Sequence, residues 1–153
     1  MKKILNNIFI ALLLVAVFFV LFLFTKSEEY EKESRIVTNV VDGDTIVVEG
    51  GQRIRLLGID APEKGELFYN ESKARLEQLV EGKEVLLEKE GENKDKYDRL
   101  LRYIFINDTN INLQLVQEGL AICYFYKTSK YQKACAELEE SARAEQKGIW
   151  STK

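Results

Sequence analysis

The chain has 153 residues, no histidine, two cysteines and a formal net charge of −3. The absence of histidine excludes the commonest general base, the commonest zinc ligand and every Ser-His or Cys-His nucleophile pair. Two cysteines are too few for a zinc cage, and an acidic chain is unlike the basic proteins that package nucleic acid. Any catalysis must therefore rely on carboxylates, arginines and a metal ion.

An unbroken apolar run of 17 residues begins at Ile8 and ends at Phe24, with Lys2 and Lys3 before it. These flanks are typical of a secretory signal or of an N-terminal anchor. Because no Ala-x-Ala pattern ends the run, we expect residues 1–26 to be a retained signal-anchor or transmembrane helix. The domain that follows would be membrane-anchored and extracytoplasmic. Secretion after cleavage of the signal is the alternative.

The next segment, residues 27–34, carries four glutamates and one lysine and has the composition of a solvated linker. We expect residues 35–153 to form a single domain, since about 120 residues are too few for two independent cores.

Short β-branched runs predict five strands, over residues 36–41, 45–49, 53–59, 84–88 and 100–106. Asp42-Gly43-Asp44 and Gly50-Gly51 are turn signals that separate the first three strands.

Three helices are expected, over residues 70–80, 110–118 and 129–148. Asn70 and Asn110 can cap the first two, and Ser129 with Gln132 has the spacing of a capping box. Five strands, with one helix between the third and fourth and two at the end, favour an α+β, mainly β fold: a five-stranded closed barrel of the OB type. An open α+β sandwich is the alternative.

The densest cluster of candidate functional residues lies among the first three predicted strands and directly after the third. Asp42, Asp44, Asp60 and Glu63 supply four carboxylates, and Arg55 supplies a permanent cation. These groups can hold a hard metal ion against a phosphate and direct water onto the phosphorus.

Residues 37–150 resemble the staphylococcal nuclease (thermonuclease) family. Five motifs occur in the family's order: VDGDT at 41–45, RLLGIDAPE at 55–63, DKYDR at 95–99, EGLA at 118–121 and GIW at 148–150. The resemblance implies a calcium-dependent phosphodiesterase that cuts DNA, RNA or both. It also implies an OB-fold barrel, and we expect a monomer.

The resemblance implies a metal site in which Asp44 and Asp60 are the carboxylate ligands of Ca²⁺. The backbone carbonyl of Ala61 would be a third ligand, and oxygen-only ligands suit this hard cation. The family's reference member has threonine at the position of Ala61, and a carbonyl ligand survives that change. Asp42 would lie behind these ligands or form the turn.

The remaining roles follow from the same resemblance. Glu63 would act as general base or orient the attacking water. Arg55 and Arg99 would clamp the phosphate and offset the charge that grows on its oxygens. The nucleotide pocket would be lined by Lys96, Tyr97 and Tyr124. A simple core position is the alternative for Tyr124, which lies in an aromatic run.

One departure from the family pattern concerns Asp98, which stands where glycine is usual. Its carboxylate could pair with Arg99 and impair catalysis, and the turn could require a positive φ. The rival function is a noncatalytic OB module, tethered to the membrane, that binds nucleic acid or protein. The noncatalytic module should have lost at least one of five charged residues, and all five are present: Asp44, Arg55, Asp60, Glu63 and Arg99.

The two cysteines, Cys123 and Cys135, are not spaced as a redox Cys-x-x-Cys pair. They form either a disulfide, as an extracytoplasmic domain would allow, or two buried thiols.

Overall fold

The computed structural model describes residues 12, 13, 15 and 32–151. The chain divides into two compact units, Met1–Tyr30 and Glu31–Lys153. Within the described residues, no helix is long and apolar enough to cross a membrane. The predicted membrane segment, residues 1–26, falls almost wholly outside the described residues and stays a prediction.

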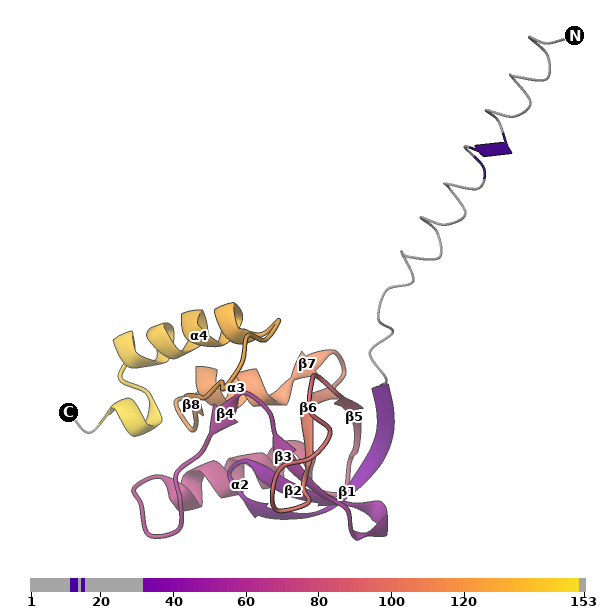
Figure 1. The fold of residues 1–153 in the computed structure, drawn as a ribbon. Coiled ribbons are helices and arrows are strands. Elements are labelled where there is room, and N and C mark those ends of the chain that lie inside the picture. Colours follow the sequence, from indigo (N-terminus) through magenta and orange to yellow (C-terminus); the bar gives the residue numbers. More distant parts are fainter. Residues whose placement is uncertain (1–11, 14, 16–31, 152–153) are drawn as a thin grey trace, which may run out of the picture. The chain divides into compact units, whose positions relative to one another are not determined.

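Five strands form a closed barrel (Figure 1). They are β1 (Lys32–Asp42), β2 (Thr45–Val48), β3 (Arg53–Leu56), β5 (Glu84–Glu88) and β6 (Leu100–Ile106). The order is β3-β2-β1-β5-β6 with antiparallel neighbours, and a parallel pairing of β3 with β6 closes the sheet. The mainly β, OB-like barrel is therefore confirmed, and the open sandwich is excluded.

Strand β1 begins earlier than the predicted domain boundary. Residues 32–34, expected in the linker, pair with β5 in the register Lys32↔Glu88 to Ser34↔Leu86. Because these three residues are charged or polar, the pattern of apolar residues did not predict that the strand includes them.

Apolar side chains from all five barrel strands meet in one core. Val37, Ile46, Ile54, Leu87 and Ile104 each have at most 1% of their surface exposed. Burial of each such side chain stabilises the fold by roughly 1.5–3 kcal/mol.

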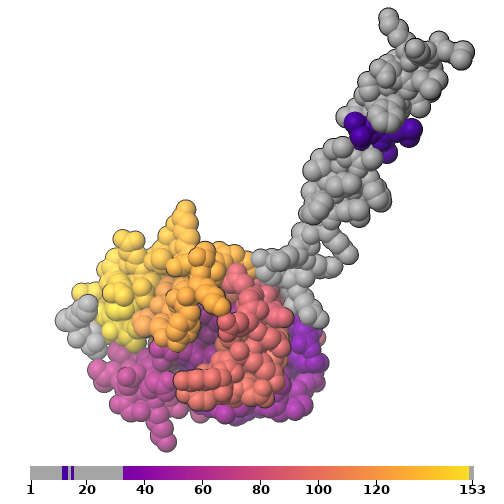
Figure 2. Space-filling view, viewed as in Figure 1, coloured from indigo at the N-terminus to yellow at the C-terminus, as the bar shows by residue number. Residues whose placement is uncertain are grey.

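Three helices accompany the barrel: α2 (Tyr69–Val80), α3 (Ile111–Gln117) and α4 (Gln132–Ala144). Asn110 caps α3 as predicted, because its side chain accepts a hydrogen bond from Leu113 N. Figure 2 shows the yellow and orange C-terminal part of the chain, which contains α4, gathered on one side of the domain.

Two predicted helix caps are wrong. Helix α2 follows Phe68, which has a φ of 67° and makes no side-chain cap, so Asn70 lies inside the first turn. Helix α4 follows Tyr131 rather than Ser129. The Ser129 hydroxyl accepts from Tyr131 N at 3.2 Å, before the helix begins, and donates to Glu90, which belongs to a distant part of the sequence.

The predicted strand over residues 53–59 is divided by a turn at Leu57 and Gly58. Gly58 has a φ of 74°, and a Cβ there would lie 2.6 Å from the Phe125 ring, so both conformation and space require glycine. The chain then enters the short strand β4 (Ile59–Asp60), which pairs with β8 (Ile122–Cys123). The remaining short elements are η1 (Glu49–Gly51), β7 (Thr109–Asn110) and η2 (Gly148–Trp150).

Candidate active site

The tight turn between β1 and β2 presents the first carboxylates of the site. The side chain of Asp42 accepts a hydrogen bond from Asp44 N at 3.2 Å, so it shapes this turn. A Cβ on Gly43 would lie 2.1 Å from Ser72 Oγ and 2.7 Å from the Ala61 side chain. Glycine therefore allows helix α2 and the segment after β4 to pack directly against the turn.

Arg55 on β3 joins two carboxylates. Its Nη1 lies 2.8 Å from Asp44 Oδ2, and its Nη2 lies 2.6 Å from Asp60 Oδ1. The same Nη1 donates to the carbonyl oxygens of Leu56 and Ile59. These four contacts fix the guanidinium, and with it the two predicted metal ligands, in one place.

Asp44 is buried beneath this guanidinium. Its Oδ1 accepts from the Thr45 hydroxyl at 3.1 Å, and its Oδ2 accepts from Ala61 N at 2.9 Å. Burial raises the pKa of Asp44 to about 7, although Arg55 and the Ala61 N–H both lower it. The negative charge of Asp44 is thus incompletely compensated, and a further cation would stabilise the ionised carboxylate.

The donors gathered here fit a hard cation. The second carboxylate oxygen of Asp60 has no hydrogen-bond partner among residues 32–151, and the Ala61 backbone lies against Asp44. Over the same residues, no cluster of three or more Asp, Glu, Cys or His side chains could hold a metal ion. A cation would therefore depend on two aspartates, a backbone carbonyl and water, which is an ordinary set for Ca²⁺.

The second candidate arginine, Arg99, approaches the same site from the loop before β6. Its Nε donates to Asp95 Oδ2 at 2.7 Å, and its Nη1 donates to Thr45 Oγ1 at 3.3 Å. Because the Thr45 hydroxyl in turn donates to Asp44, Arg99 is two hydrogen bonds away from the buried carboxylate. The loop thus brings the two predicted phosphate ligands, Arg55 and Arg99, to one side of the barrel.

Asp98 does not form the pair with Arg99 that its position in the sequence allowed. The Asp98 carboxylate lies 2.6 Å from Lys94 Nζ, while Asp95 holds Arg99. The conformational expectation is confirmed, because Asp98 has a φ of 63°. In this conformation the Asp98 carboxylate contacts Lys94, and Arg99 Nη2 has no hydrogen-bond partner among residues 32–151.

Glu63 lies in the exposed loop after β4 and is not held against the other candidates. Its backbone N donates to Glu66 Oε2 at 2.7 Å. Its own carboxylate makes no hydrogen bond or ion pair with any residue that the structure describes. A free, ionisable carboxylate can accept a proton from water, but the contacts that would orient it must come from a ligand.

Tyrosines occupy the rim of the site. Tyr124 N donates to Gly58 O at 2.9 Å, and the Tyr124 hydroxyl donates to that of Tyr126 at 2.7 Å. This hydroxyl contact is the main cause that raises the pKa of Tyr124, and the charges of Asp60 and Arg55 also act on it. Tyr124 is 43% exposed, so it is a surface residue beside the carboxylate pair rather than a core residue.

The other two predicted pocket residues, Lys96 and Tyr97, contact each other. Lys96 Nζ lies 4.9 Å from the centre of the Tyr97 ring, and the Arg99 guanidinium lies 5.4 Å from the same ring. Tyr97 is 66% exposed, so a ligand held by Arg99 can reach its ring.

Three further residues lie at the site and were not predicted from the sequence: Thr45, Asp95 and Tyr126. Thr45 belongs to the quoted VDGDT motif, and Asp95 precedes Arg99 by four residues, a spacing that allows an ion pair in a compact loop. Tyr126 lies two residues after Tyr124, outside any strand, and is 85% exposed.

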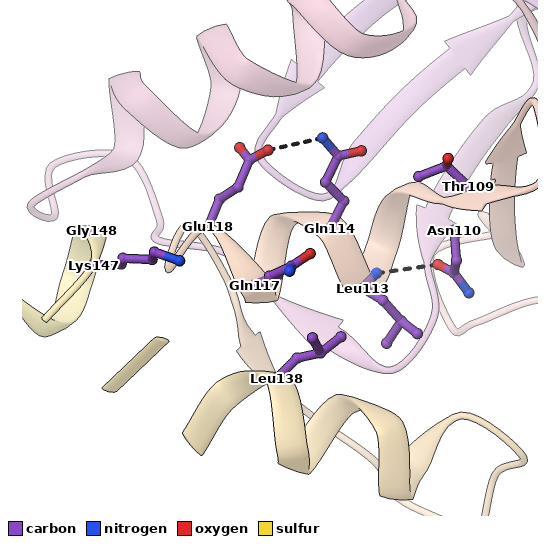
Figure 3. Close-up of a pocket in the computed structure, with 9 residues that line it drawn as sticks. All are labelled: Thr109, Asn110, Leu113, Gln114, Gln117, Glu118, Leu138, Lys147 and Gly148. Atoms are coloured by element: carbon purple, nitrogen blue, oxygen red, sulfur yellow. Dashed lines mark hydrogen bonds between the residues drawn. The ribbon is translucent and has the colours of Figure 1, made fainter. Parts of the chain in front are cut away.

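A separate pocket of about 840 Å³ lies between helices α3 and α4 (Figure 3). Its polar side chains already serve the helix: Gln114 donates to Glu118, and Asn110 caps the first turn. None of the candidate catalytic residues lines it. The candidate active site is therefore the cluster around Arg55, apart from this pocket.

The fold and the site define a nuclease-type OB barrel, and the chain belongs to the staphylococcal nuclease family. The family model described as "Staphylococcal nuclease homologue" matches residues 53–152. The chain is 34% identical to the thermonuclease of Staphylococcus intermedius, over 98% of this chain and 99% of that protein. It is 36% identical to an "Uncharacterized endonuclease" of Haemophilus influenzae, over 79% of this chain and 68% of that protein. A micrococcal nuclease of Shigella flexneri is 37% identical, over 75% of this chain and 72% of that protein.

Proposed function

We propose that this protein is a calcium-dependent nuclease that hydrolyses phosphodiester bonds in DNA, RNA or both. One observation carries the proposal: a single guanidinium, that of Arg55, holds Asp44 and Asp60 together beside the backbone of Ala61. Nuclease relatives of similar sequence support the reaction class. The calcium requirement rests on the donor chemistry of the site.

Asp44, Asp60 and the carbonyl of Ala61 would hold the ion. When bound, Ca²⁺ supplies positive charge close to the phosphate. Glu63 accepts the proton that the attacking water loses, since its carboxylate has no competing partner among the described residues. The aspartates cannot take this role while they are bound to the cation.

The two arginines stabilise the negative charge that grows on the phosphate oxygens. Arg55 retains its Nε hydrogen and one Nη2 hydrogen without a partner in the described part of the chain. Arg99 uses its Nε for Asp95 and one Nη1 contact for Thr45, and within the described residues its Nη2 has no partner, so it can bind a phosphate oxygen or the departing oxygen. Fixed cationic donors of this kind lower the barrier most when they need no rearrangement.

A ring platform completes the site. Tyr97 and Tyr124, with Lys96 nearby, offer exposed faces and a cation to a sugar, base or terminal phosphate. Stacking on such rings tolerates any base. We further propose a monomer whose domain lies outside the cytoplasm, anchored by residues 1–26 or secreted after their cleavage.

The experiment is a digestion assay with the full chain on single- and double-stranded DNA and on RNA, with calcium or with a chelator. We expect cleavage in calcium alone. Glu63→Gln should lower the rate by at least 10²-fold. The matched control is Glu66→Gln, an exposed residue of the same loop whose amide oxygen can still accept from Glu63 N. Full cleavage in chelator would reject the calcium requirement, and binding without cleavage would favour a noncatalytic module.

A further inference from the structure

Cys123 and Cys135 form a disulfide rather than two buried thiols, and Cys123 pairs with Ile59, the residue before the predicted metal ligand Asp60. We propose that these two cysteines are positioning residues for the nuclease: by tying β8 to α4, their bond holds Asp60 and Tyr124 in place for calcium and nucleotide. The inference rests on the proposed function. On this proposal the disulfide contributes to calcium and nucleotide binding as well as to the stability of the fold.

The link fixes β8 to a rigid element. Cys135 lies in the first turns of α4 and is fully buried, and its Cα is 6.0 Å from that of Cys123. One turn further along α4, Glu139 accepts a hydrogen bond from Cys123 N at 3.1 Å. Helix α4 therefore holds Cys123 in two ways: by the disulfide to Cys135 and by the hydrogen bond from Cys123 N to Glu139.

Strand β8 in turn holds the strand that carries a predicted metal ligand. Cys123 pairs with Ile59, and Ile122 pairs with Asp60. Each of these strands has two residues, and they form a separate two-stranded sheet. A two-stranded sheet this short is not stable by itself. The position of β4 therefore depends on the contacts that hold β8. The disulfide does so directly opposite Ile59, one residue before Asp60.

The same disulfide fixes one end of residues 124–128, the segment that carries Tyr124 and Tyr126. Tyr124 follows Cys123 directly, and its N–H donates to Gly58 O. At the other end, Glu90 accepts hydrogen bonds from Ser129 Oγ at 2.6 Å and from Lys130 N at 3.0 Å. With the disulfide reduced, no covalent cross-link would hold the segment that carries Tyr124, and only noncovalent contacts would position it.

The test measures two constants on the full chain: the calcium concentration for half-maximal cleavage, and the KM for single-stranded DNA. Replacement of both cysteines by alanine (Cys123→Ala with Cys135→Ala) should raise each constant about tenfold, because small displacements of positioned groups are costly. Assays are run at a temperature where near-UV circular dichroism shows the variant folded. The control is Val85→Ala, which removes buried side-chain atoms from β5, a strand that pairs with β1 and β6 and not with β4 or β8. Its two constants should equal those of the native chain.

A second measurement uses the native chain, so that the proposal is tested even if the double alanine variant does not fold. Treatment of the native chain with a dithiol passes two electrons and two protons to the disulfide, giving two cysteine thiols and a cyclic disulfide of the reagent. We expect both constants to rise as thiols appear in titration, and to return on reoxidation.

The outcomes separate the two proposals. Cleavage by the oxidised chain, with both constants unchanged after complete reduction, would overturn the positioning role and leave the nuclease intact. An oxidised chain that binds calcium without cleaving would refute the nuclease, and calcium titration calorimetry before and after reduction would still decide the positioning role. An oxidised chain that binds no calcium would overturn both.

Discussion

Arg55 and Asp44 form an ion pair of 2.8 Å in which both side chains are largely buried, at 14% and 8% exposure. The second Nη group of Arg55 simultaneously reaches Asp60 at 2.6 Å. One cation thus offsets the mutual repulsion of two carboxylates that would otherwise lie near each other without compensation. The arrangement holds the metal donors in position before any ion arrives, which reduces the reorganisation needed for binding.

Replacement of Arg55 by lysine should lower the cleavage rate by about 10²–10³-fold. A lysine ammonium is a point charge that cannot span two carboxylates and still donate to a phosphate. Initial rates on single-stranded DNA in saturating calcium measure the effect. Arg53→Lys is the matched control, since Arg53 lies two residues earlier on β3 and is exposed. Its rate should stay within about twofold of the native rate, and an equal loss in both variants would contradict the role given to Arg55.

Calcium should stabilise the folded protein through Asp44 and Asp60. A ligand at 100 times its Kd stabilises the native state by about 2.7 kcal/mol, which raises Tm by roughly 10 °C in a domain of this size. Thermal unfolding with calcium and with chelator measures the shift. Asp60→Asn should remove most of it, whereas Glu63→Gln should retain it while losing activity. A lost shift in Glu63→Gln would make Glu63 a calcium ligand instead of a base.

Substitution of Asp98 by glycine should raise the free energy of unfolding by up to about 1 kcal/mol. Asp98 has a φ of 63°, which glycine adopts without a steric penalty, and its contact with Lys94 is exposed and weak. Urea unfolding measures the gain. Asp108 is a matched position, with a φ of 64° in the turn between β6 and β7, and should respond similarly. Neither variant should lose cleavage activity, because Asp95 rather than Asp98 holds Arg99.

The Arg75–Glu118 pair should make stability depend on pH. Arg75 Nε and Nη2 donate to the two Glu118 oxygens at 2.6 and 2.7 Å, and these hydrogen bonds lower the pKa of Glu118 below its ordinary value of 4.5. A lowered folded-state pKa gives stability that is present above 4.5 and is lost as pH falls through the folded value. Arg75→Met should therefore cost about 1 kcal/mol at pH 7, a value limited by solvent screening, and less below pH 4.

Urea unfolding of Arg75→Met at several pH values measures that dependence. Lys73→Met is its control, because Lys73 lies on the same helix and only approaches Glu77 at 3.8 Å. We expect the control to stay within about 0.5 kcal/mol of the native chain at every pH. A cost for Arg75→Met that did not diminish in acid would show that the side chain acts through packing instead.

Local signals predicted much of the fold. The β-branched runs predicted the barrel strands because side-chain shape and alternation act within a few residues. Asn110 was identified as a cap for the same reason, since its partner Leu113 is three residues away. The Ser129 hydroxyl does accept from Tyr131 N, but the helix begins only at Gln132, and the same hydroxyl donates to Glu90, 39 residues earlier in the chain, a partner that no local pattern indicates.

The sequence by itself determined which chemical groups are present: carboxylates and arginines without histidine, in motifs of one nuclease family. Only the tertiary structure decided which acid meets which cation. Arg55 joins Asp44 and Asp60, while Arg99 pairs with Asp95 and reaches Thr45, 54 residues away. Electrostatic partners are chosen by distance and burial in space, and the closed barrel sets both where sequence separation cannot.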